Sequence, residues 1–154
     1  MIKEWITKKD IRKIEKKLDV TKSLTKNEVF LLQTADWSEF RIQSYCHNLF
    51  NNSGFGDRAI FFQVDNGGSS IEGVRKKKAA AGTKSGFPDV MIIVFNEKNT
   101  LNIYIEFKKI NGSIKEPQKE WNKFLRSKEQ SAYICNNIVF FEEVVLKEIR
   151  NFLN

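Results

Sequence analysis

The stretch of sequence that decides the fold is residues 82–108, GTKSGFPDVMIIVFNEKNTLNIYIEFK. Two apolar runs, residues 90–95 and 101–105, flank the polar cluster 96–99, and this pattern predicts a β-hairpin. A four-residue turn that joins residue 95 to residue 100 makes residue 90 pair with residue 105. Asp89 then lies directly opposite Glu106, so the two carboxylates stand at the same end of the hairpin.

The side chains at this end of the hairpin predict a cation site. Residues opposite each other on paired strands share a face, and Lys108, two residues after Glu106, points to that face as well. Two adjacent carboxylates repel each other, and a divalent metal ion with a lysine-held water is the usual compensation. The structural alternative is an ion pair of Glu106 with Lys108 or Lys109, with Asp89 as an ordinary turn residue.

The Pro88-Asp89 and Glu106-Phe107-Lys108 segments resemble the PD-(D/E)xK nuclease superfamily and, within it, the VRR-NUC family. Over residues 37–140 the chain carries further elements of the family's pattern in the same order. They are Glu39 with Gln43 on a helix, Asn66 before Gly73 and a basic run, the glycines Gly82 and Gly86, and Gln118 with Trp121 one turn later. Residues 1–35 match no part of that pattern.

The resemblance implies a restriction-endonuclease-like fold and metal-dependent hydrolysis of phosphodiester bonds in DNA. By the family's pattern, Asp89, Glu106 and the backbone carbonyl of Phe107 would bind Mg²⁺ or Mn²⁺. Lys108 would orient or deprotonate the attacking water. Stand-alone proteins of this family look like phage or bacterial enzymes that cut branched DNA as homodimers. DNA and a second copy of the chain are therefore the expected partners.

The resemblance assigns two more side chains to this site. Gln118 would hold Lys108 or a metal-bound water, and Glu39 would serve a second metal ion or orient water. Periodicity places Glu39 on the core-facing line of a helix that opens at Asp36. Asp36 and Glu39 are also spaced as a capping box, with Asp in place of the usual Ser or Thr, so a structural role for Glu39 stays open.

A basic run lies in the connection 67–86, for which the composition predicts about one turn of helix. Its members are Arg75, Lys76, Lys77 and Lys78. Next to an acidic metal site, this run and Lys84 would contact the phosphate backbone, which positions nucleic acid without reading its sequence. A solvated face is the alternative. The formal net charge of +7 and the pI of about 9.4 favour a polyanionic partner.

The length of 154 residues suffices for one domain with a buried core. We expect an N-terminal helical extension at residues 1–35, with a charged helix at 8–19, and the nuclease domain at residues 36–154. Further strands are predicted at 59–64 and 131–135, and further helices at 117–127 and 141–153. The fold class is therefore α/β, with a mixed β-sheet flanked by helices.

Several function classes do not fit this sequence. No apolar run approaches the roughly 20 residues of a membrane span, and the start lacks a signal-peptide core. Residues 82–86 lack the Gly-x-x-x-x-Gly-Lys order of a phosphate loop, so no nucleotide cofactor is expected. Cys46 and Cys135 are isolated in the sequence, which fits reduced cysteines in a cytoplasmic protein. If the protein is phage-encoded, this is the cytoplasm of the bacterial host.

Two further function classes stay open as alternatives. One is a non-catalytic nucleic-acid-binding module that kept the nuclease fold, although the complete set of two acids and Lys108 argues against it. The other is an assembly protein that binds a partner through its N-terminal helix, which would explain residues 1–35 but not the acidic site.

Overall fold

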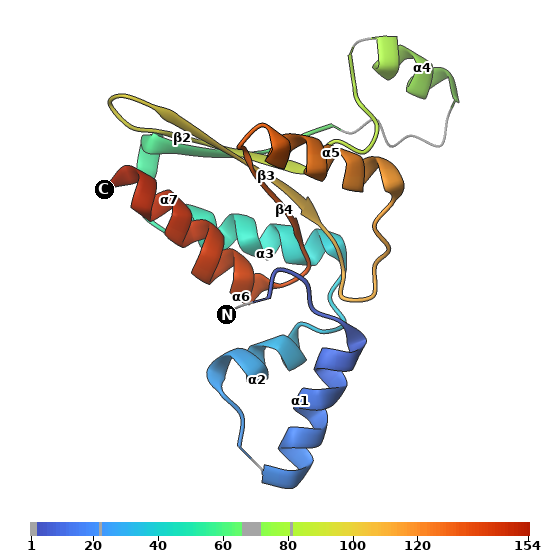
Figure 1. The fold of residues 1–154 in the computed structure, drawn as a ribbon, viewed down its shortest axis with the longest axis vertical. Helices are drawn as coiled ribbons and strands as arrows, with labels where there is room; N and C mark the ends of the chain where they lie inside the picture. The colour runs from blue at the N-terminus through green and yellow to red at the C-terminus, as the bar shows by residue number, and fades with distance from the viewer. Residues whose placement is uncertain (1–2, 22, 66–71, 81) are drawn as a thin grey trace.

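The computed structural model describes residues 3–21, 23–65, 72–80 and 82–154. Within these residues the centre is a four-stranded sheet in the order β1 (Ala59–Gln63), β2 (Val90–Phe95), β3 (Thr100–Phe107) and β4 (Ser131–Cys135). β2 pairs antiparallel with β1 and with β3, whereas β4 runs parallel to β3. The sheet is therefore mixed and flanked by helices (Figure 1), as the sequence predicts.

The central hairpin has the predicted register. Val90 pairs with Ile105, and the turn holds four residues. The turn begins at Asn96, whose Oδ1 accepts hydrogen bonds from two backbone N–H groups of the same turn at 2.8 and 3.0 Å. One step beyond the Val90 pair, the register puts Asp89 opposite Glu106.

The hydrophobic core lies on one face of the sheet. Six side chains of β2 and β3 are completely buried on it, namely Val90, Ile92, Val94, Ile103, Ile105 and Phe107. Helix α3 (Glu39–Asn51) and the C-terminal helical segment cover this face (Figure 1). Both described cysteines are buried in this core as free thiols.

The C-terminal helical segment begins at Ile138, three residues before the predicted start at 141. It consists of α6 (Ile138–Phe140), a π-helical turn η2 (Phe141–Val145) and α7 (Leu146–Leu153). The early start has a local cause, because the Oδ1 of Asn137 caps the helix and accepts a hydrogen bond from the N–H of Val139 at 3.0 Å.

Helix α5 (Glu116–Ser127) lies on the opposite, outer face of the sheet, next to β4 (Figure 1). It begins one residue before the predicted start, with Pro117 in its first turn. The outer face away from α5 exposes large apolar side chains, since Ile60 is 49% exposed and Phe62 is 40% exposed.

Two helices form the N-terminal end of the chain. α1 (Lys8–Thr21) confirms the predicted charged helix, whereas α2 (Lys26–Gln33) is a helix that the sequence interpretation did not predict. Thr25 and Glu28 form a capping box at the start of α2. Their Thr-x-x-Glu spacing was the signal that could have located this helix.

The N-terminal segment is attached to the sheet. The side chain of Asn136, just after β4, exchanges two hydrogen bonds with the backbone of Ile6, at 2.8 and 2.7 Å. Ile6 and Ile11 then pack with Ile110 in a small second core. In the part of the chain that the structure describes, no helix combines the length and the apolar composition of a membrane span.

Candidate active site

Asp89 is held at the start of β2 by both neighbouring strands. Its backbone carbonyl accepts a hydrogen bond from the N–H of Val64, just past β1, at 2.8 Å. Its Oδ2 accepts another from the N–H of Phe107, in β3, at 3.0 Å. Because Asp89 and Glu106 are opposite in the register, both side chains belong to the outer face. The hairpin thus brings the two carboxylates to one end of one face.

The loop that leads into Asp89 is fastened to α5. The indole N–H of Trp121 donates a hydrogen bond to the backbone carbonyl of Ser85 at 3.2 Å. The ring of Phe87 packs edge-on against Trp121, with ring centroids 5.0 Å apart. Gly86, between these contacts, has a φ of 76°, a left-handed conformation that favours glycine. Gly86 is one of the two glycines of the family pattern, and this backbone conformation is the physical reason for a glycine at the position.

The carboxylate of Glu106 is the centre of the site. The residue is only 2% exposed, and its Oε1 accepts hydrogen bonds from the Nζ of Lys108, at 2.6 Å, and from the Nε2 of Gln118. Its Oε2 is also buried but has no hydrogen-bond partner among the described residues. A buried acceptor without a partner destabilises a fold, typically by about 1–3 kcal/mol. A cation bound at Oε2 would remove this destabilisation, which favours a cation at this atom.

Gln118 positions the carboxylate of Glu106. Its Oε1 accepts a hydrogen bond from the backbone N–H of Lys115 at 2.9 Å, at the start of α5. This bond fixes the amide so that Nε2 points to Glu106. The expected partner of Gln118 was Lys108 or a metal-bound water, whereas its partner in the structure is Glu106.

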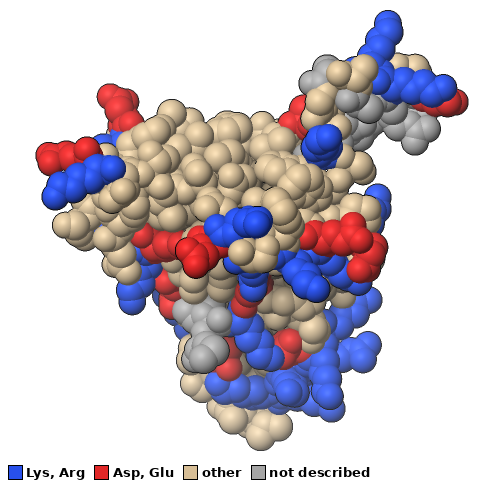
Figure 2. Space-filling view, turned by 45° about the horizontal axis from the view of Figure 1, so that its top comes forward, with Lys and Arg blue, Asp and Glu red and all other residues tan. Residues whose placement is uncertain are grey.

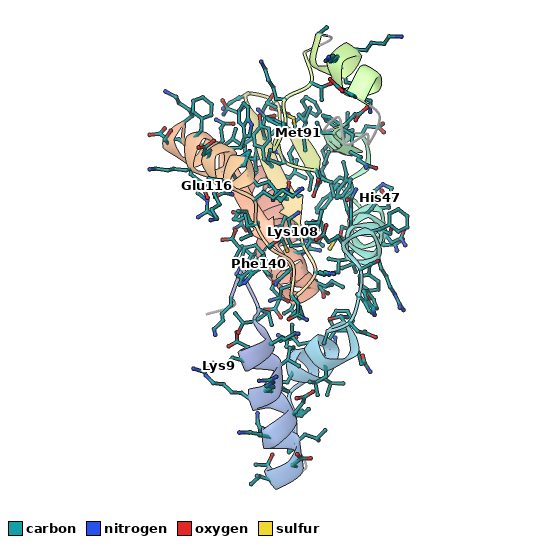
Figure 3. All side chains as sticks on the ribbon, turned by 90° about the vertical axis from the view of Figure 1, so that its right-hand side faces the viewer. Lys9, His47, Met91, Lys108, Glu116 and Phe140 are labelled. Atoms are coloured by element: carbon teal, nitrogen blue, oxygen red, sulfur yellow. The ribbon has the colours of Figure 1, made fainter. Side chains whose placement is uncertain are left out.

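Lys108 lies between the helices on the two sides of the sheet, α5 and α3 (Figure 3). It is 7% exposed, and besides Glu106 its Nζ approaches the Oε2 of Glu39 at 3.7 Å. The Glu39 side chain is 45% exposed, so it can reach both Lys108 and solvent. The structure thereby joins Glu39 to the site through Lys108.

Ser38, rather than Asp36, caps α3. The Oγ of Ser38 accepts a hydrogen bond from the N–H of Arg41 at 3.2 Å, and α3 begins at Glu39. The capping box of Asp36 and Glu39, which was the structural alternative, is wrong. Asp36 lies in the turn before the helix, and this turn is closed by a hydrogen bond from the N–H of Trp37 to the carbonyl of residue 34. The helix start therefore does not require the Glu39 carboxylate.

Gly112 lies against the site, although no sequence pattern predicted it there. A Cβ atom at this position would lie 3.2 Å from the Oε1 of Glu39 and 3.4 Å from the Cδ of Lys108. The loop after β3 can approach both side chains closely because this residue has none. A glycine four residues after Lys108 was the only signal, and it resembles any loop glycine.

Burial and charge shift the pKa values of both partners at the centre. Burial raises the pKa of Glu106 to about 7. The hydrogen bond from Lys108 opposes this rise, and the charges of Asp89 and Glu39 add to it. Burial alone would lower the pKa of Lys108, but its contacts with the surrounding carboxylates, Glu106 first, outweigh burial and raise it. Lys108 is therefore an ammonium group at neutral pH.

The donor set limits what kind of metal ion can bind. Among the described residues, no group of three or more His, Cys, Asp or Glu side chains is arranged to hold a metal ion. A cation at Asp89 and Glu106 would therefore take its other ligands from backbone oxygen, water or substrate. Mg²⁺ suits such a set, because it prefers oxygen ligands and usually keeps several of its waters.

The predicted basic run lies away from this centre, on a helix that stands apart from the sheet (Figure 1). This helix, α4 (Glu72–Ala80), has nine residues where about one turn was predicted. Lys76 pairs with Glu72, Lys78 pairs with Asp65, both at 2.8 Å, and Lys77 is exposed. The side chain of Arg75 lies outside the described part. Lys84, in the loop before Asp89, is exposed.

Of the remaining residues of the family pattern, one lies apart from the site and one falls outside the part of the chain that the structure describes. Gln43 lies on α3 and lines a separate hollow with His47 and Gln63. Asn66 is outside the described residues. His47 is exposed on the helix surface.

Comparison with known proteins gives one match. The family model described as the VRR-NUC domain matches residues 27–137, which is most of the chain and includes α2 from its second residue onward. No curated protein and no solved structure matches the chain significantly. The match contains all of the residues gathered around Glu106, namely Glu39, Asp89, Lys108, Gly112 and Gln118. The chain therefore belongs to the VRR-NUC family, a family of nucleases.

Proposed function

We propose that this protein is a metal-dependent nuclease that hydrolyses phosphodiester bonds in DNA. The observation that carries the proposal is the buried carboxylate of Glu106, opposite Asp89 in the hairpin register. A purely structural ion pair with Lys108 accounts for the Oε1 atom of Glu106. It leaves the buried Oε2 atom unexplained, whereas a metal ion would use it.

Asp89, Glu106 and the backbone carbonyl of Phe107 are the proposed ligands of Mg²⁺ or Mn²⁺. A bound ion of this kind would activate water and polarise the scissile phosphate. The chain supplies few carboxylates, which leaves room for water and phosphate oxygens around the ion. Gln118 would keep the Glu106 carboxylate in one orientation throughout.

Lys108 is proposed to orient the attacking water and to offset the negative charge that develops on the phosphate. Its raised pKa keeps it protonated, so it can donate hydrogen bonds. The same raised pKa argues against Lys108 as the group that removes the water's proton. Glu39 would hold the ammonium from its other side and could orient a second water or serve a second ion.

DNA is the proposed substrate because the protein is positively charged and DNA is a polyanion. The chain carries a formal net charge of +7. Figure 2 shows Lys and Arg side chains projecting from α4 and gathered over the N-terminal helices. The lysines of α4 and Lys84 are the proposed contacts to the phosphate backbone, together with Arg75. Such contacts add affinity for any sequence and make binding sensitive to salt.

We further propose that the enzyme is a homodimer that prefers branched DNA. Two copies of charge +7 repel each other, so their contact should use an uncharged face. Figure 2 shows a wide area without charged side chains between the hairpin tip and α4. The outer sheet face, with Ile60 and Phe62 each exposed by 40% or more, supplies apolar surface for such a contact. Sedimentation analysis measures the oligomeric state directly.

One assay tests the proposed activity. The protein is incubated with plasmid, single-stranded and branched DNA in Mg²⁺, in Mn²⁺ or in EDTA. We expect cleavage with either metal ion, fastest on branched DNA, and none in EDTA. The Glu106→Gln variant, which keeps the side-chain shape, should bind DNA without cutting it. DNA binding by the wild-type protein with no cleavage in any metal would instead support a non-catalytic binding module.

A further inference from the structure

A row of four aromatic rings runs from the sheet out along α5. Its members are Tyr104, Phe87, Trp121 and Phe124, in this order, each edge-on to the next. The ring centroids are separated by 5.7, 5.0 and 5.7 Å. The row starts on the outer face of β3 and ends in solvent.

The inner part of this row has a structural explanation, but its end does not. Tyr104, Phe87 and Trp121 are half-buried, and Trp121 also fastens the loop before Asp89. Phe124 is 51% exposed and lines an open hollow of about 350 Å³ with Ser85, Pro117, Glu120 and Trp121. Such a hollow can take a flat, apolar ring on its floor.

The hollow is close to the candidate active site along the same helix. Gln118, which contacts Glu106, precedes Trp121 by one helical turn. Phe124 follows one turn later, about 9 Å from Gln118 along the helix axis. A nucleotide strand with one phosphate at Glu106 would therefore reach Phe124 within a few nucleotides.

The charges around the hollow fit one nucleotide in a particular orientation. The Nζ of Lys128 lies 5.8 Å from the centre of the Phe124 ring, and Lys123 is exposed on the same helix. These lysines can bind the phosphate. Glu120 on the rim would repel a phosphate but can accept a hydrogen bond from a base amino group. The rings are therefore suited to the base and the lysines to the backbone.

We propose that Phe124, with Trp121 and Lys128, forms a stacking site for an unpaired base within a few nucleotides of the scissile phosphate. This inference rests on the proposed nuclease function and narrows its substrate to DNA with unpaired nucleotides beside the cut. Single-stranded bases offer a free face to an aromatic ring, and this interaction tolerates any base. Bases inside a duplex are covered by their neighbours and must be unstacked first.

Binding in EDTA tests the site without cleavage. Labelled single-stranded DNA and a blunt duplex of the same sequence are titrated with wild-type protein, Phe124→Ala, Phe124→Trp and Phe95→Ala. Phe95 is a matched control, because it is 39% exposed and lies at the hairpin tip, far from α5 (Figure 1). Phe124→Ala should weaken single-strand binding at least about fivefold, and duplex binding less than about twofold. Phe124→Trp should restore wild-type binding, and Phe95→Ala should match it.

A fluorescent base gives a second, independent readout. 2-Aminopurine in the single strand loses fluorescence when it stacks, so wild-type protein should quench it and Phe124→Ala should not. Equal loss of affinity for both DNA forms, or no loss for either, would overturn the stacking site. A change in oligomeric state of Phe124→Ala with unchanged DNA binding would assign this surface to a protein contact instead. If wild-type protein neither binds nor cuts any DNA, the proposed function itself fails.

Discussion

A methyl group at Gly86 would lie 2.5 Å from the Cβ of Pro117 and 2.9 Å from its carbonyl carbon. No real Cβ comes so close to another atom, so the loop before Asp89 can rest on the start of α5 only through a glycine. The contact has a functional consequence, because the same few residues of α5 carry Gln118, which positions Glu106. The loop and the helix thus set the two carboxylates relative to each other.

Gly86→Ala should reduce both stability and cleavage. The left-handed backbone alone destabilises a residue with a side chain by about 1–3 kcal/mol, and the clash with Pro117 adds to this. Gly82→Ala is the matched control, because Gly82 lies in the same loop with a φ of 94°, but an added Cβ would have no atom of the described residues within 4 Å. Chemical denaturation should show a clearly larger loss for Gly86→Ala. Equal losses would mean that the Pro117 contact adjusts without strain.

Lys108→Met should slow cleavage strongly while DNA binding persists. Methionine fills the buried site but offers neither a positive charge nor a hydrogen-bond donor to Glu106. Loss of one such donor at a developing negative charge typically slows reactions about 100- to 1,000-fold. Single-turnover cleavage at saturating protein measures this loss. Lys108→Arg should not restore the rate, because a planar guanidinium differs in shape and reach. Undiminished cutting by Lys108→Met would remove this lysine from the mechanism.

The stability of the metal-free protein should depend on pH around neutrality. Burial raises the pKa of Glu106 to about 7 in the folded state, above its value in the unfolded chain. The folded protein therefore binds this proton more tightly, and the stabilisation is lost as the pH rises through about 7. A metal ion needs the deprotonated carboxylate, so the stabilisation by Mn²⁺ should increase over the same range.

Thermal melting between about pH 5.5 and 8.5, with and without Mn²⁺, measures both effects. Glu106→Gln does not titrate at this position, so it should lose this part of the pH dependence and the response to Mn²⁺ together. A shift by Mn²⁺ that is the same across the range would contradict the link between metal binding and the Glu106 proton.

Removal of the α4 lysines should weaken DNA binding for all sequences alike. Each lost phosphate contact should lower the slope of log affinity against log salt by about 0.7–0.9. Lys77 should contribute more than Lys76 or Lys78, because those two lysines already pair with carboxylates. Lys98→Ala, an exposed lysine at the hairpin tip, is the control. An unchanged slope after triple substitution would make α4 a merely solvated helix.

The hairpin and its two carboxylates could be predicted from the sequence because local features determine them. The apolar runs give the strands, and the turn from Asn96 sets the register by its length. This register alone puts Asp89 opposite Glu106. The mixed sheet also follows, because the helical pattern of α5 separates β3 from β4, which allows a parallel connection.

The parts that the sequence did not reveal depend on contacts between distant segments or on competing caps. Ser38 and Asp36 are both good helix caps, and only the turn before α3 decides between them. The partner of Gln118 is set by how α5 docks on the sheet. Gly112 matters only because α3 and the loop after β3 meet at Glu39. A local sequence pattern cannot predict such contacts, because they join segments that are far apart in the sequence.

Glu39→Gln should distinguish between the two roles considered for this residue, a structural role at the start of α3 and a catalytic role in the site. Since Ser38 caps α3, the loss of the Glu39 charge should cost little stability: about 0.3–1 kcal/mol through the helix dipole, and a small further amount through the partly exposed ion pair with Lys108. Its carboxylate faces Lys108 at 3.7 Å, so the substitution removes a charge that holds the ammonium in place. We therefore expect near-normal melting without metal and strongly reduced cleavage in Mg²⁺.

Ser38→Ala is the matched control for Glu39→Gln, because it removes the cap next door and leaves the carboxylate. It should destabilise the fold by about 0.5–2 kcal/mol, while the remaining folded protein cleaves DNA at the normal rate. Ser38→Ala should thus lower the melting temperature but not the rate of single-turnover cleavage, whereas Glu39→Gln should lower the cleavage rate but hardly the melting temperature. Full activity of Glu39→Gln would leave a site built on Asp89, Glu106 and Lys108 alone, with Glu39 as a surface residue at the start of its helix.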